Sequence, residues 1–224
     1  METQLIELVA ANIAFVGSHF ALSHPLRAPL VSALGERGFQ LLYTVVSFAT
    51  LFWVIAAYRS APTADLPGSG EAGWIIASLI TIPALVLLMG SYVKNPAMPM
   101  PGAANNARKE PAGVFLVTRH PMMWSFALWA ASHVILWWNL RSVITALAMG
   151  FLALVGAHMQ DRKKRMQMGD AWAAWESRTS YWPRWSQLFK VGLLWWALGL
   201  MMWVLLTYVH QTFGGVPAGI WRWF

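Results

Sequence analysis

The chain has 224 residues, of which 58% are hydrophobic and 11% are charged. Since a soluble domain carries about 25% charged residues, this composition excludes an ordinary soluble fold and predicts an integral membrane protein in contact with the lipid bilayer. The net charge of +7 is explained by basic loops beside the membrane, so we expect no nucleic-acid partner, and the absence of cysteine excludes disulfides, iron–sulfur clusters and covalent c-type haem.

Six apolar runs follow one another along the chain, each close to the ~20 residues that a transmembrane helix needs. They cover residues 4–23, 38–58, 73–93, 121–138, 141–159 and 190–210. Segments rich in proline, glycine and charge separate most of them, as is typical of loops. The sequence therefore predicts an all-α, polytopic integral membrane helical bundle of about six transmembrane helices, which forms one domain over residues 1–224.

Two connections have further consequences for the arrangement. The fourth connection, at residues 139–141, is very short, so the two helices that it joins should form an antiparallel hairpin. After the hairpin, the spacing of Met166, Trp172 and Trp175 predicts an amphipathic helix on the cytoplasmic face, within about residues 161–180.

The distribution of lysine and arginine predicts the orientation, because cytoplasmic loops carry the excess of these residues. Thirteen of the sixteen lie in the first, third and fifth connections, and three lie in the second, the fourth and the carboxyl-terminal tail. We therefore expect a multi-pass protein of the bacterial inner membrane with both termini on the periplasmic side.

Most of the ionisable residues that the sequence places in or beside the helices as functional candidates are histidines. The set consists of His19, His120, His133 and His158, with His24 and His210 at helix edges. Ionisable groups inside a membrane are costly and are therefore functional candidates, although a single histidine usually only hydrogen-bonds a neighbouring helix. Several histidines, with no carboxylate inside any helix after the first, favour a metal or haem site, and two imidazoles on different helices can hold haem b between them.

Short motifs link the chain to a known family. They are Phe15-Val16-Gly17-Ser18-His19, residues 34–39, residues 42–47, Thr118-Arg119-His120-Pro121-Met122, residues 128–133, Asp161-Arg162 and residues 178–180. On these motifs the chain resembles the NnrU family of bacterial membrane proteins, whose relatives include the plastid cis-zeta-carotene isomerase. The resemblance implies a haem b protein with metal ligands at His19 and His133, linked with nitrogen-oxide metabolism (denitrification) or with redox or isomerase-like chemistry on a lipophilic small molecule.

The predicted topology leaves the histidine pairing open. His19 should lie on the cytoplasmic side of the membrane midplane and His133 slightly beyond it, an offset of roughly 10 Å at ~1.5 Å of rise per residue. His19 paired with His120, or with His158, matches better in depth.

A second resemblance concerns Arg119-His120-Pro121, followed by a Trp-rich helix and later by Gly169 and two tryptophans. This pattern is similar to isoprenylcysteine carboxyl methyltransferases and sterol reductases, and it implies a membrane methyltransferase or reductase with a nucleotide-type cofactor at the Arg-His-Pro motif. A non-catalytic haem-binding or assembly protein is a third possibility, so whether the chain is an enzyme stays open.

Four polar residues should meet at the cytoplasmic face whichever function is right. Arg119 and His120 open the fourth helix, while Asp161 and Arg162 follow the fifth, and the short turn at Asn139 brings those two helix ends together. We predict one cofactor-binding or head-group-binding site from these four side chains. The alternative is that the arginines contact lipid phosphates and Asp161 pairs with a neighbouring base.

Overall fold

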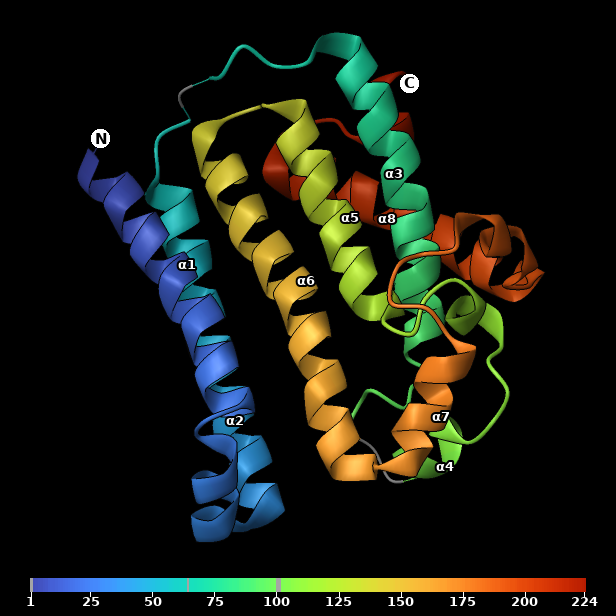
Figure 1. The fold of residues 1–224 in the computed structure, drawn as a ribbon. Helices are drawn as coiled ribbons and strands as arrows, with labels where there is room; N and C mark the ends of the chain where they lie inside the picture. The colour runs from blue at the N-terminus through green and yellow to red at the C-terminus, as the bar shows by residue number, and fades with distance from the viewer. Residues whose placement is uncertain (1, 64, 100–101) are drawn as a thin grey trace.

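The computed structural model describes residues 2–63, 65–99 and 102–224, and these residues form a bundle of helices (Figure 1). The long helices are α1 (Glu2–Ser23), α2 (Arg27–Ser60), α3 (Gly70–Ser91), α5 (Pro121–Leu136), α6 (Leu140–Met168) and α8 (Leu193–Gly214). The short ones are α4 (Ala103–Ala107) and α7 (Asp170–Arg178), with the 3-10 turns η1 (Gly113–Leu116), η2 (Trp185–Lys190) and η3 (Gly219–Arg222). The predicted all-α membrane bundle is confirmed.

Five of the long helices, α1, α2, α3, α6 and α8, have the length and hydropathy to cross a membrane. The remaining one, α5, is apolar but has 16 residues, which corresponds to a length of roughly 24 Å. It packs against α3 on one side and α6 on the other. The chain is thus a multi-pass membrane protein in which α5 is the shortest of six apolar helices.

The two ends of the bundle differ in their connections (Figure 1). Both termini lie at one end, which we call the terminal end, together with the turn between α5 and α6. The short helices α4 and α7 and the turn between α1 and α2 lie at the opposite end, which we call the basal end. Most lysines and arginines belong to the basal connections, so the charge asymmetry of the sequence follows the two ends of the fold.

The second helix begins earlier than the apolar run indicated. Residue 38 is the first of the predicted helix, whereas α2 starts at Arg27 and includes Gly35 with a φ of 70° and a ψ of 169°. Glycine adopts this positive φ without a steric penalty, so the chain bends at Gly35 and helical structure resumes after it.

The fifth predicted helix also continues past its expected end. Residue 159 ends the apolar run, but α6 extends to Met168, because no glycine or proline interrupts the polar turns that follow. Asp161 therefore lies on α6 itself, and the separate helix α7 begins only after Gly169, whose φ is 51°. The last long helix spans Leu193–Gly214 where 190–210 was expected, since Gly192 with a φ of 101° precedes its start.

Close contact between α3 and α8 depends on a glycine. A Cβ atom at Gly199 of α8 would lie 2.8 Å from the backbone nitrogen and the Cα atom of Val86 in α3. A small residue at this point lets the two helix backbones approach, as is common between membrane helices.

The helices α1 and α2 form an antiparallel hairpin that contacts the rest of the bundle mainly where α1 packs on α6. Among the described residues, three hydrogen bonds join this hairpin and the residue that follows it to α6, and they lie at the terminal end. The Tyr58 and Ser142 hydroxyls are 2.7 Å apart, and Nη1 of Arg141 donates to the carbonyl oxygens of Tyr58 and Ala61 at 3.2 Å each. The space between the hairpin and the other helices contains the main cavity.

Candidate functional site

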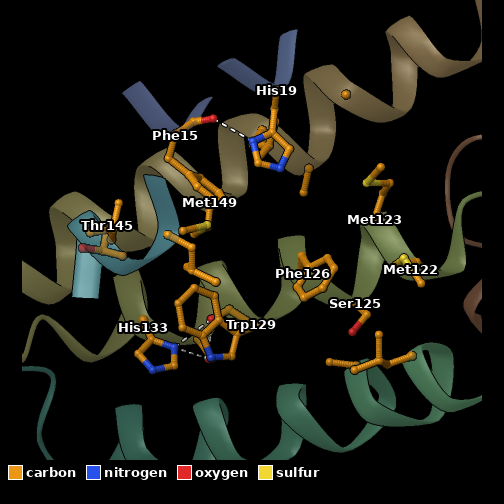
Figure 2. Close-up of a pocket in the computed structure, with 18 of the residues that line it drawn as sticks. Phe15, His19, Met122, Met123, Ser125, Phe126, Trp129, His133, Thr145 and Met149 are labelled. Atoms are coloured by element: carbon orange, nitrogen blue, oxygen red, sulfur yellow. Dashed lines mark hydrogen bonds between the residues drawn. The ribbon is translucent and has the colours of Figure 1, made fainter. Parts of the chain in front are cut away.

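The interior of the bundle holds a cavity of about 1610 Å³, to which all six long helices contribute. Aromatic and aliphatic side chains make up much of its wall, as the close-up in Figure 2 shows around Phe126, Trp129 and Met149. Ligand pockets for small molecules usually measure ~300–1,000 Å³. This cavity therefore has room for a large apolar ligand, or for more than one ligand.

His19 and His133 both line this cavity, from α1 and α5 respectively (Figure 2). The Nδ1 atom of His19 lies 2.7 Å from the carbonyl oxygen of Phe15, and that of His133 lies 2.9 Å from the carbonyl oxygen of Trp129. A carbonyl oxygen only accepts, so each Nδ1 atom carries the proton and each Nε2 atom keeps its lone pair. This is the arrangement in which a neutral imidazole ligates a metal.

Aromatic packing fixes both rings further. The ring of His19 lies 4.3 Å from that of Phe15 and 5.6 Å, edge-on, from that of Tyr43. The ring of His133 lies 4.3 Å from that of Trp129. Two imidazoles of the type that ligate haem iron therefore line one cavity, and the binding of haem b by His19 and His133 stays a prediction.

The structure brings a third histidine beside His133. His210 of α8 also lines the cavity, its ring centroid is 6.5 Å from that of His133, and its Nδ1 atom donates to the carbonyl oxygen of Val216 at 2.9 Å. Sequence reasoning placed His210 at a helix edge and missed this contact, because no sequence signal shows that α8 packs beside α5. Over the described ranges, no three or more His, Cys, Asp and Glu side chains gather to hold a bare metal ion.

The other histidines are placed differently. His120 is buried outside the cavity lining, and both of its ring nitrogens have hydrogen-bond partners. His158 is exposed and also does not line the cavity. His24 lines the cavity at its basal end. The depth-matched pairs of His19 with His120 or His158 therefore do not share one cavity.

Arg119, His120 and Asp161 meet at the basal end, as the hairpin of α5 and α6 predicts. The Nε atom of Arg119 lies 3.0 Å from each carboxylate oxygen of Asp161, and its Nη2 atom lies 2.5 Å from Oδ2. Nε2 of His120 lies 2.8 Å from Oδ1 of Asp161, and its Nδ1 lies 3.1 Å from Oε1 of Gln160. Arg162, the fourth predicted member, is exposed and takes no part in these contacts.

Contacts from α7 and from the segment after it cover the cluster of Arg119, His120 and Asp161. Glu176 of α7 lies 3.7 Å from Nη2 of Arg119 and accepts two hydrogen bonds of 2.7 Å from Arg165. The segment after α7 folds back, and the carbonyl oxygen of Ser180 accepts from the backbone N–H of Arg119 at 2.8 Å. Neighbouring Tyr181 has its pKa raised by burial and by the negative charge of Asp161, so its hydroxyl stays protonated.

Arg119, His120 and Asp161 do not line the cavity, although Gln160, which contacts His120, does. Their charges are balanced within the protein, and their contacts join α5, α6, α7 and the segment after α7. Binding of a cofactor or head group by Arg119, His120, Asp161 and Arg162 stays a prediction.

The fold and the cavity define the class of this protein: a multi-pass helical membrane protein with histidines around an apolar interior. A family model described as "NnrU protein" matches residues 7–218. The chain therefore belongs to the NnrU family. Searches of curated proteins and of solved structures gave no match.

Proposed function

We propose that this NnrU-family protein binds haem b in its membrane cavity, with His19 and His133 as the iron ligands. One observation carries the proposal: both histidines line the same cavity, and each donates its Nδ1 proton to the carbonyl oxygen four residues earlier. This hydrogen bond orients the ring and raises the basicity of the Nε2 atom. We place the protein in the bacterial inner membrane with both termini periplasmic, on the basis of the lysine and arginine distribution.

Bound haem would supply a redox-active iron, and the chain would supply the surroundings that control it. Phe126, Trp129 and Met149 give the cavity an apolar wall that limits water, which tunes the potential and reactivity of a haem iron. The size of the cavity leaves space for a lipophilic substrate beside the macrocycle. Redox or isomerase chemistry on such a molecule, with a link to nitrogen-oxide metabolism, is the activity that we propose.

Four single variants test the ligand assignment: His19→Ala, His133→Ala, His24→Ala and His210→Ala. The measurement is the Soret absorbance per mole of detergent-purified protein, at matched expression and with its shift on reduction recorded. We expect haem to be lost from the first two variants and retained in the last two, since alanine supplies no ligand to the coordination position that an axial imidazole leaves.

The outcomes separate the candidate pairs. Equal haem in all four variants would overturn the assignment. Loss of haem from His133→Ala and His210→Ala, with haem kept in His19→Ala, would identify His133 of α5 and His210 of α8 as the iron ligands instead. Colourless wild-type protein that binds S-adenosylmethionine or NADPH would instead favour a methyltransferase or a reductase.

A further inference from the structure

The basal end of the cavity carries an excess of positive charge that haem ligation does not use. Arg27, Lys163 and Lys164 line it there, with Glu36 as the acidic side chain. Glu36 already pairs with Arg27, Oε1 to Nη2, at 2.6 Å. Neither lysine forms an ion pair or a hydrogen bond with any residue that the structure describes, so among these residues both positive charges face the cavity without a partner.

The burial of one of these two lysines bears on what the cavity can bind at this end. Lys164 is 5% exposed. The burial concerns mainly the aliphatic stem of Lys164, whereas its ammonium group lies at the cavity, where a counter-charge would stabilise it. Burial lowers the pKa of nearby His24, and the positive charges of Lys163 and Arg162 lower it further, so this region already disfavours an additional cation. An anion at this end of the cavity would relieve the repulsion.

The position of the lysines indicates that the anion does not belong to a haem ligated by His133. The antiparallel hairpin around Asn139 places His133 level with Thr145 of α6, and both residues line the cavity (Figure 2). From Thr145 to Lys164, α6 rises by roughly 28 Å at ~1.5 Å per residue. This distance is greater than the width of a porphyrin, so a haem ligated by His133 does not reach the lysines, whereas a long acyl chain with its head group at the lysines extends along much of the cavity.

We propose that Lys163 and Lys164 bind the anionic head group, a carboxylate or a phosphate, of a long-chain amphiphile whose apolar tail occupies the cavity. A carboxylate head group balances one of the two ammonium charges and a phosphate monoester balances up to both, while the tail displaces water from the aromatic and aliphatic wall. This site does not depend on bound haem.

The test compares an anionic with a neutral amphiphile of equal chain length. Binding of oleate and of oleyl alcohol is measured by displacement of a fluorescent fatty acid from full-length protein in a non-ionic detergent. We expect oleate to bind at least about tenfold more tightly than the alcohol. The double variant Lys163→Gln with Lys164→Gln should lose this preference.

Arg162→Gln is the matched control, because Arg162 is adjacent on α6 and exposed but does not line the cavity. It should keep the full preference for oleate. Equal binding of oleate and oleyl alcohol by the wild type, or an equal loss of preference in the control, would overturn the proposal.

Two further arms identify the source of the anion and guard against misfolding. Lysophosphatidic acid and oleate distinguish a phosphate head from a carboxylate head, and preference for either over the alcohol supports the site. Inorganic phosphate that displaces the probe as well as oleate does would show a simple anion site and refute the role of the tail.

The double variant should unfold at a temperature no lower than the wild type, since it removes unpaired buried charge; a marked decrease would assign the lysines a structural role instead.

Discussion

The substitution Asp161→Asn tests the cluster that joins the basal ends of α5, α6 and α7. The Asp161 side chain is 5% exposed, accepts three hydrogen bonds from Arg119 and pairs with His120. Asparagine keeps the shape of the side chain but leaves the guanidinium, itself 11% exposed, without its closest counter-charge. Removal of one partner from a buried ion pair costs about 3–5 kcal/mol of unfolding free energy.

For a chain of this size, the expected loss corresponds to a decrease of roughly 6–20 °C in the unfolding midpoint. The assay is thermal unfolding in detergent, followed by intrinsic tryptophan fluorescence. Asp170→Asn makes the same chemical change at an exposed residue in the first turn of α7, where loss of a helix-dipole interaction costs only ~0.3–1 kcal/mol. If the two variants unfold at the same temperature, the buried ion pair does not stabilise the fold as argued.

Two further predictions concern packing and topology. Gly199→Ala should destabilise the protein by about 1–3 kcal/mol, because the added methyl group overlaps the backbone of α3. Gly156→Ala is the control, because the space around its Cβ position is open; it should be neutral or should stabilise the protein by up to ~1 kcal/mol through helix propensity. Thermal unfolding of the two alanine variants measures the difference, and equal midpoints would contradict the proposed close approach. Reporter fusions check the orientation: a fusion after Trp185 should be cytoplasmic and one after Phe224 periplasmic, and a cytoplasmic carboxyl terminus would refute the orientation deduced from lysine and arginine.

Local sequence signals predicted a large part of the fold. Each apolar run became a helix, because an uninterrupted run of this length can bury its backbone polar groups only by helical hydrogen bonding. The short connection at Asn139 was equally informative, because it constrains two helices to be antiparallel neighbours. That constraint was enough to predict that Arg119 and Asp161 meet, without any knowledge of the other helices.

Contacts between segments distant in sequence were not predictable in this way. The proximity of the His133 and His210 rings depends on how α8 packs beside α5. The position of Glu176 near Arg119 depends on how α7 folds back. Lys163 and Lys164 belong to the thirteen lysines and arginines from which the orientation was predicted. Their charge is visible in the sequence, but the direction in which the side chains face depends on the rotation of α6 about its own axis.

The attachment of the α1–α2 hairpin has a mechanical consequence. Its hydrogen bonds to α6 gather around Tyr58, Arg141 and Ser142 at the terminal end, and toward the basal end the two parts meet through apolar contacts such as that of Phe20 with Phe151. Apolar side chains can exchange one another for lipid tails at little cost inside a bilayer. We therefore expect the basal part of the hairpin to separate from α6 more readily than its hydrogen-bonded terminal part.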